Sequence, residues 1–359
     1  MANRSQVPAA RSHGASTAPL LQGSWLTRGE EGRFSAYLPR DGEVVRWTEE
    51  PGGRWSGPVS LGGDGLTPFL AVGQGPDRYV HLVGLRPTAG GEGHVELVHC
   101  VQFQTGRPAA PWRPIGHSNG KGPWTGNPAV AVDAQGRAYA FVRNGGGGLS
   151  VRAQKDAGGW HPWWDLHGWG TDPSPVAVRN GEGRVELLTA TDKGLLRYVQ
   201  EESGGRPVRK DVLPADVTFG TLAAVTGPSG HATLFYVDRA GQVRAWSAGR
   251  DLEPTVIGEA VGTGRLAAAT CLVDGVETTV LARQSAGGRL AVASYPSERE
   301  PEALTWSEHG DPQASLDTVL TRGADGRLVA MALAGGGAPI ATRQKEAAGL
   351  HLEGWRSIG

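Results

Sequence analysis

The chain has 359 residues, enough for two average domains or for one large all-β domain. Its 35 Lys and Arg residues balance its 36 Asp and Glu residues, and the arginines are scattered, which disfavours nucleic acid as a partner. No apolar run approaches the roughly 20 residues that a membrane-spanning helix needs, and the 56 glycines and 24 prolines argue against long helices.

The N-terminal segment predicts a tail rather than a targeting signal. Residues 1–17 lack the apolar stretch of a secretory signal, so we expect a flexible tail on a cytoplasmic protein, with another export route left open. Residues 18–359 are then a single domain. The two cysteines, Cys100 and Cys271, form no Cys-x-x-Cys pair, which favours two buried thiols over a disulfide.

One unit recurs along the chain: a small apolar strand, a turn that ends in glycine, and a second strand. Its copies are LLQGSWLTRGEEGRFSAYL (from Leu20), FLAVGQGPDRYVHLV (Phe69), AVAVDAQGRAYAFV (Ala129), PVAVRNGEGRVELLT (Pro175), LAAVTGPSGHATLFYV (Leu222), AAATCLVDGVETTVLA (Ala267) and DTVLTRGADGRLVAMAL (Asp317). Each copy continues with a third strand opened by glycine, such as GEVVRW at Gly42. A fourth strand follows, often led by tryptophan, as in GRWSGPVSLGG and GWHPWWDLHG.

Four short strands per unit in seven units predict an all-β fold, a seven-bladed β-propeller of four-stranded antiparallel blades. The last copy stops after its fourth strand at Gly359. We therefore expect the N-terminal strand, residues 20–26, to join the C-terminal blade and close the ring, which would remove an exposed sheet edge.

The apolar inner strand, the D/N-x-x-G turn and the closing W-x-x-W/V-x-x-L-G-G pattern resemble the bacterial PLL-type lectins, the DUF346-like propellers. GRWSGPVSLGG at Gly53 and GWHPWWDLHGWGTDP at Gly159 are the best matches. The resemblance implies the propeller fold and fucose-type sugar binding in shallow pockets between blades, each with an aromatic platform. The second tryptophan of the pair is present only as Trp163, and the first copy has Pro58 in its place. This departure from the family pattern leaves at most one or two sugar sites rather than seven, and the best of them is expected at Trp163 and its blade neighbours.

Four of the twelve tryptophans fall in the segment 158–178. Trp160 and Trp163 fit the outer-strand pattern, for which we expect packing between blades. Trp164 alternates with Trp163 along a strand and should point the other way, toward partial exposure, where we predict that it contacts substrate. Trp124 and Trp169 lie in loops where the repeat demands no packing, so we predict them as walls of a substrate pocket.

Polar and aromatic residues precede or begin several inner strands at comparable positions of the repeat. They are Asn127, Asp172, Phe219, Arg265 and Asp317. Together they predict an asymmetric substrate-binding ring, which suits a single ligand.

Two residues are candidates for acid–base chemistry. His117 opens an inserted loop and would act as a general base or bind a ligand, although a solvated loop histidine explains it equally well. Asp172 would assist by proton transfer, with a turn-forming role before proline as the alternative. His167 would contact substrate. Its spacing from His161 matches no metal-ligand motif, so no metal or other cofactor is expected.

Three functions remain open from the sequence. The first is a single-pocket protein that acts on a small apolar or aromatic molecule, as a cofactor-independent cyclase, isomerase or lyase. The second is a PLL-like lectin that binds a glycan. The third is a non-catalytic interaction scaffold. The oligomeric state and the identity of the ligand are not specified by the sequence.

Overall fold

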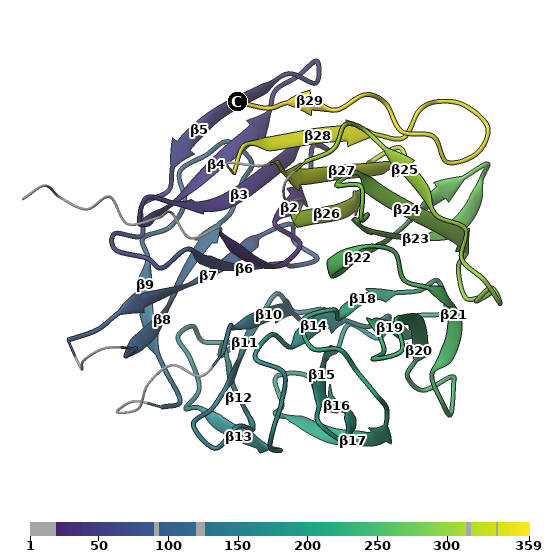
Figure 1. The fold of residues 1–359 in the computed structure, drawn as a ribbon. Helices are drawn as coiled ribbons and strands as arrows, with labels where there is room; N and C mark the ends of the chain where they lie inside the picture. The colour runs from purple at the N-terminus through teal and green to yellow at the C-terminus, as the bar shows by residue number, and fades with distance from the viewer. Residues whose placement is uncertain (1–18, 90–92, 120–125, 314–316, 335–336) are drawn as a thin grey trace, which may run out of the picture.

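The computed structural model describes residues 19–89, 93–119, 126–313, 317–334 and 337–359. Within these ranges the strands form seven sheets around a central channel (Figure 1). The prediction of an all-β, seven-bladed propeller is therefore confirmed. Over the same ranges, no helix has the length and apolar character needed to cross a membrane.

Every blade is built from four consecutive antiparallel strands, with the first strand next to the channel and the fourth at the outside. The first blade contains β2 (Leu26–Arg28), β3 (Phe34–Arg40), β4 (Glu43–Glu49) and β5 (Trp55–Ser60), and the second contains β6 (Phe69–Gln74), β7 (Val80–Pro87), β8 (Val95–Gln102) and β9 (Arg113–Gly116). The third blade contains β10 (Ala129–Val132), β11 (Ala138–Arg143), β12 (Leu149–Ala153) and β13 (Trp164–His167). The fourth contains β14 (Val176–Arg179), β15 (Val185–Thr191), β16 (Gly194–Gln200) and β17 (Pro207–Pro214).

The remaining blades follow the same order. They are β18 (Ala223–Thr226), β19 (Ala232–Val237), β20 (Gln242–Ser247) and β21 (Thr255–Glu259); β22 (Thr263–Val273), β23 (Val276–Gln284), β24 (Leu290–Pro296) and β25 (Ser307–His309); and β26 (Asp317–Arg322), β27 (Leu328–Leu333), β28 (Pro339–Arg343) and β29 (Arg356–Ser357). One further strand, β1 (Leu20–Gly23), precedes the first blade.

The repeated D/N-x-x-G turns close the hairpins between first and second strands by a local mechanism. In the third blade, Oδ1 of Asp133 accepts hydrogen bonds from the backbone N–H groups of Gln135 and Arg137, each 3.0 Å long. Gly136 has a φ of 80°, a left-handed conformation that glycine adopts without steric cost. The turn therefore depends on its own residues, which explains why it is readable from the sequence.

In three blades, the tryptophan that leads the outer strand connects the blade to the one before it. Nε1 of Trp112 donates to the carbonyl oxygen of Leu61 at 2.9 Å, and Nε1 of Trp306 donates to that of Glu259 at the same distance. Trp160 packs edge-on against His99 of the second blade, with ring centroids 5.1 Å apart. The repeated tryptophan is therefore a packing residue at the blade interfaces.

The predicted closure of the ring is wrong. The C-terminal blade contains four strands of its own, and β1 instead pairs in parallel with β6, the inner strand of the second blade, in the register Leu20↔Phe69 to Gly23↔Val72. Gly23 has a φ of 71°, and a Cβ on it would lie 2.1 Å from the carbonyl oxygen of Val72. This left-handed glycine interrupts residues 20–26, so β1 and β2 belong to different sheets.

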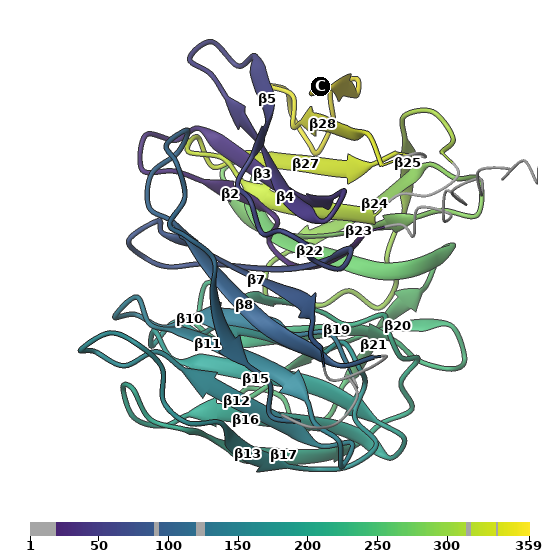
Figure 2. The same cartoon turned by 90° about the vertical axis from the view of Figure 1, so that its left-hand side faces the viewer.

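Side chains close the ring where the first blade meets the last; the two blades lie side by side in both views, and β2 contacts β26 (Figures 1 and 2). One apolar cluster spans this joint, with Phe34 from the first blade and Met331 and Ile358 from the last. Arg343 forms an ion pair with the buried Glu49 and lies over the ring of Phe34, 5.3 Å from its centroid. Closure therefore depends on packing and an ion pair, with no strand shared between the two blades in the described part of the chain.

Both cysteines are buried and free, as the sequence predicted. Burial raises the pKa of the Cys100 thiol and that of the Cys271 thiol to about 12. Thiols of this kind stay protonated at neutral pH and are poor nucleophiles.

Candidate functional site

Hydrogen bonds connect two of the predicted residues, Asn127 and Asp172, with each other through Ser174 and with the backbone of the next blade. Nδ2 of Asn127 donates to Oγ of Ser174 at 3.0 Å, and the N–H of Ser174 donates to Oδ1 of Asp172 at 2.8 Å. The other carboxylate oxygen of Asp172 accepts from the N–H of Gly220, also at 2.8 Å. Part of the predicted ring thus exists as a continuous network.

The Asp172 carboxylate is fully buried, and it accepts hydrogen bonds from backbone N–H groups on either side of it. Burial raises the pKa of this carboxyl, while the backbone hydrogen bonds and the charges of Arg265 and Arg143 oppose the rise. These contacts match the turn-forming alternative for Asp172. Its catalytic role stays a prediction.

His117 lies at the end of the second blade, beside Trp163, with ring centroids 6.3 Å apart. Its Nδ1 accepts a hydrogen bond of 2.9 Å from the N–H of Asn119, and burial lowers the pKa of the ring to about 4. The imidazole is therefore neutral at pH 7. No contact among the described residues joins His117 to Asp172, and a shared catalytic role for the two stays a prediction.

In the tryptophan-rich segment 158–178, two tryptophans pack between blades and the others are partly exposed. Trp160 and Trp163 pack against an apolar cluster shared by the second and third blades, as expected. Trp164 is half-buried and stacks at 4.9 Å on His161. His167 is exposed and lies 3.2 Å from the carboxylate of Asp165.

The remaining aromatic candidates lie at the surface. Trp169 is 58% exposed, with the ammonium group of Lys193 5.8 Å from its ring centroid, and Phe219 is 43% exposed. Trp124 lies outside the described residues. None of Trp164, His167, Trp169 and Phe219 lines either of the two cavities described below, so their role in substrate binding stays a prediction.

The exposure of Trp169 permits a direct test of whether it is a core residue. We expect Trp169→Ala to lower the free energy of unfolding by less than about 1 kcal/mol, since little more than an exposed cation–π contact is lost. Urea unfolding followed by circular dichroism measures this. Trp246→Ala, at a tryptophan that is 2% exposed, is the matched control and should cost about 3–5 kcal/mol.

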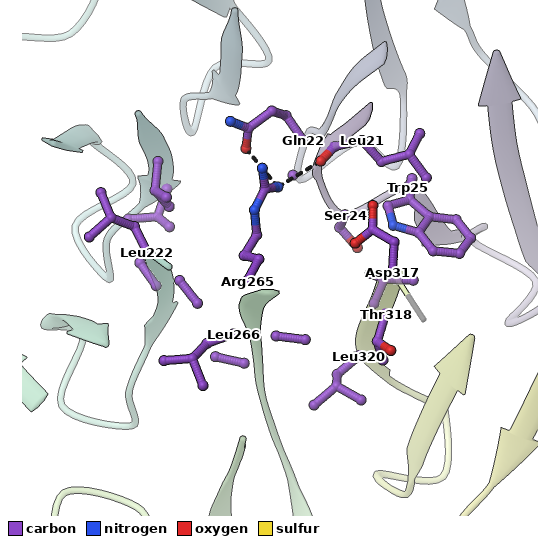
Figure 3. A pocket seen from close by; sticks show the side chains of 18 of the residues that line it. Leu21, Gln22, Ser24, Trp25, Leu222, Arg265, Leu266, Asp317, Thr318 and Leu320 are labelled. Atoms are coloured by element: carbon purple, nitrogen blue, oxygen red, sulfur yellow. Dashed lines mark hydrogen bonds between the residues drawn. The ribbon is translucent and has the colours of Figure 1, made fainter. Parts of the chain in front are cut away.

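The central channel contains a cavity of about 210 Å³ that β1 helps to enclose (Figure 3). Its walls come from β1 and from the inner strands of the fourth to seventh blades. Arg265 and Asp317, two of the predicted ring residues, both line it. Nη1 of Arg265 donates to the carbonyl oxygen of Leu21 at 2.6 Å and to Oε1 of Gln22 at 3.0 Å.

A second cavity, of about 540 Å³, lies at the joint of the ring, and we call it the seam pocket. It is lined by Pro19, Leu38, Pro39, Arg40, Asp41, Gly42, Trp47, Pro58, Leu66, Thr67, Pro68, Gly337, Ala338, Pro339 and Gly359. These residues come from β3, β4, β5 and the β3–β4 turn, from the connection to β6, from the β27–β28 turn with the start of β28, and from the chain at Pro19 and Gly359. The seam pocket thus lies between the first, second and last blades.

The seam pocket combines apolar walls with a charged rim. The indole of Trp47 is 3% exposed and forms part of its lining together with several prolines. At the rim, Nε of Arg40 lies 3.4 Å from Oδ2 of Asp41, and both side chains are exposed. Sequence reasoning missed this pocket, because its parts are brought together only when the two ends of the propeller meet.

Among the described residues, no group of three or more His, Cys, Asp or Glu side chains is arranged to hold a metal ion. The two cavities therefore have to be interpreted through their apolar walls and their charged side chains.

Solved structures share this fold at low sequence identity. BP39L lectin from Burkholderia pseudomallei matches with a TM-score of 0.72 and 17% identity over 96% of this chain and 99% of its own. A polysaccharide lyase of family PL25, an ulvan lyase, matches with a TM-score of 0.59 and 11% identity over 96% of both chains.

A mutant of Aleuria aurantia lectin, solved with α-methyl-L-fucoside, matches with a TM-score of 0.54 and 12% identity, again over 96% of both chains. No protein-family model matches the sequence, and no curated protein matches it either. At these identities the likeness is one of fold, and it agrees with the resemblance to lectin propellers.

Proposed function

We propose that this protein is a lectin-like propeller that binds a fucose-type sugar in the seam pocket. The observation that carries the proposal is an inter-blade pocket with tryptophan and proline walls and a charged rim, in a fold shared with BP39L lectin and Aleuria aurantia lectin. The second of these was solved with a fucoside, and a sugar of that class is the ligand proposed for this chain.

The chemistry of the pocket suits a deoxy sugar. Such a sugar presents an apolar face and a methyl group, which would contact Trp47, Pro58 and Leu38. Its hydroxyl groups would bind at the rim, where Arg40 donates and Asp41 accepts hydrogen bonds. Apolar walls with a few polar groups at defined positions are typical of small-ligand sites.

The alternative of a cyclase or another biosynthetic enzyme has less support. Two of the three solved structures named above are lectins, and the third is a polysaccharide lyase that acts on a carbohydrate rather than a biosynthetic enzyme. The two acid–base candidates, His117 and Asp172, are not joined by any described contact and line neither cavity. The glycan-binding alternative is therefore the better account.

We expect one strong sugar site per chain. At other blade interfaces, tryptophans of the outer strands are engaged in packing, as Trp112 and Trp306 show through their hydrogen bonds to the preceding blade. The seam differs because a cavity remains there between the blades, lined by Trp47 and Pro58. Isothermal titration calorimetry with α-methyl-L-fucoside should therefore report a stoichiometry of one.

The proposal is tested by substitutions at the rim. We expect Arg40→Ala and Asp41→Asn each to weaken binding of α-methyl-L-fucoside at least tenfold, or about 1.4 kcal/mol, with no change in unfolding midpoint, because both side chains are exposed. Asparagine tolerates the left-handed backbone at position 41, where φ is 53°. Titration calorimetry, preceded by a glycan array, gives the measurement.

Arg184→Ala is the matched control, since Arg184 forms a comparable exposed ion pair with Glu182 at 3.4 Å. It should bind the fucoside as the unsubstituted chain does. Binding that survives both rim substitutions would place the sugar elsewhere on the propeller. An array on which no glycan is retained would reject carbohydrate binding itself.

A further inference from the structure

The channel cavity shares no lining residue with the seam pocket. At about 210 Å³ it is far larger than a single ordered water requires, which is about 10–15 Å³ of comparable space. Most of its lining is apolar, with Leu21, Leu222 and Leu320 among the larger side chains. The channel can therefore accommodate a small molecule as well as solvent.

Arg265 and Asp317 both line this cavity, and their opposite charges form no direct ion pair. Arg265 interacts electrostatically with Asp317 and with the buried Asp172, yet no ion pair within 4.0 Å joins it to either carboxylate among the described residues. Arg265 donates to the neutral acceptors on Leu21 and Gln22. Burial raises the pKa of the Asp317 carboxyl, and the charge of Arg265 opposes the rise. Charges in such surroundings are costly unless a partner compensates them.

The same cavity holds polar atoms that lack partners. Nε2 of Gln22, on a residue only 3% exposed, has no hydrogen-bond partner among the described residues, although its Oε1 accepts from Arg265. Oγ1 of Thr318, next to Asp317, is likewise buried and unpartnered within that part of the chain. Buried polar groups in native proteins are normally satisfied, so these atoms indicate a missing partner in the channel.

We propose that the channel binds a small zwitterion, an α-amino acid with an apolar side chain. Its carboxylate would bind Arg265 and its ammonium group Asp317, while its side chain would contact the leucines of the walls (Figure 3). An anion alone would leave Asp317 without a contacting cation, and a cation alone would leave Arg265 without a contacting anion. A neutral sugar would compensate neither charge. A zwitterion is the ligand class that offsets both charges.

The experiment uses the full chain and three probes of similar shape in titration calorimetry: L-leucine, 4-methylpentanoate, which lacks the ammonium group, and isoamylamine, which lacks the carboxylate. We expect L-leucine to bind at least tenfold more tightly than either analogue. Asp317→Asn, which keeps the shape of the side chain, should weaken the binding of L-leucine at least tenfold.

Asp325→Asn is the matched control, at an exposed aspartate on the same blade that pairs with Arg327 at the β26–β27 turn. It should leave L-leucine binding unchanged. Should L-leucine fail to bind, bind no better than the two analogues, or bind Asp317→Asn equally well, the proposal is wrong. Fucoside binding at the seam pocket would persist in each of those cases, so the two proposals fail separately.

Discussion

Deletion of residues 1–23 is expected to lower the free energy of unfolding by about 3–5 kcal/mol. The deletion removes β1 and with it Leu21, which is 2% exposed, together with the parallel pairing of four residues with β6. It also removes the two hydrogen-bond acceptors of the Arg265 guanidinium on Leu21 and Gln22. A buried Leu side chain alone contributes about 2–5 kcal/mol in comparable truncations, and an uncompensated buried charge adds to the loss.

Urea unfolding of the truncated and full chains, followed by circular dichroism, gives the difference. Deletion of residues 1–17, which the sequence predicts as a tail, is the control and should leave the urea midpoint of unfolding unchanged. A second variant, Gln22→Ala, keeps β1 but removes one acceptor of Arg265, and it should cost less than the full deletion. Equal stability of the full chain and the chain lacking residues 1–23 would show that β1 contributes nothing to the fold.

Acid is expected to destabilise the protein strongly between pH 6.5 and pH 4 because of a buried pair of neutral histidines. His81 and His99 are 3% and 6% exposed, and Nδ1 of His81 lies 3.0 Å from Nε2 of His99. Burial lowers the pKa of His81 to about 4, and burial together with His81 lowers that of His99 to about 3. Both rings are therefore neutral in the folded protein at pH 7.

The sign of this change in the free energy of unfolding with pH follows from proton uptake. An unfolded histidine has a pKa near 6.5, so as the pH falls below that value the unfolded chain binds protons that the folded chain excludes. The stability contribution is complete above pH 6.5 and is lost as the pH falls toward the folded pKa values. Between pH 7 and pH 4.5 the loss is about 2 kcal/mol for one such histidine.

The variant His81→Leu/His99→Phe replaces both rings with apolar groups, so it should lose this part of the pH dependence while folding at pH 7. The measurement is the free energy of unfolding in urea at intervals from pH 7.5 to pH 4.5. His167→Gln, at an exposed histidine, is the control and should keep the original slope. Identical slopes for the double variant and the unsubstituted chain would contradict the prediction.

The blades were predictable because their determinants are local. A turn such as that of Asp133 and Gly136 is specified by its own residues, and the recurrence of such turns at similar spacing specifies a propeller. The closure was mispredicted because strand propensity alone runs through residues 20–26. The left-handed conformation of Gly23, and its close approach to Val72, depend on a tertiary neighbour that no repeat pattern reveals.

For the candidate site too, residues within the repeat could be located from the sequence, whereas residues in loops and at the joint of the ring could not. Asn127, Asp172, Arg265 and Asp317 were predicted from comparable places in the repeat. The structure places Arg265 and Asp317 in the lining of the channel cavity, an electrostatic interaction relates Arg265 to Asp172, and Ser174 connects Asn127 to Asp172. The loop aromatics, such as Trp169, could not be placed in this way, because the path of a loop is independent of the strand period. The seam pocket was missed because the two ends of the chain create it jointly.

The closure by side chains has a consequence for how such a protein can evolve. The four antiparallel strands of each blade form one uninterrupted stretch of sequence, and no sheet is shared between the first and last blades in the described ranges. The exception to this simple order is β1, which precedes the first blade and pairs with the second. A gene duplication or deletion that respects these stretches and leaves the second blade in place adds or removes a complete sheet and leaves the others intact. Only the interfaces beside the altered blade must then be repacked, whereas a propeller whose termini share a sheet would have its closing blade split by a change at either end.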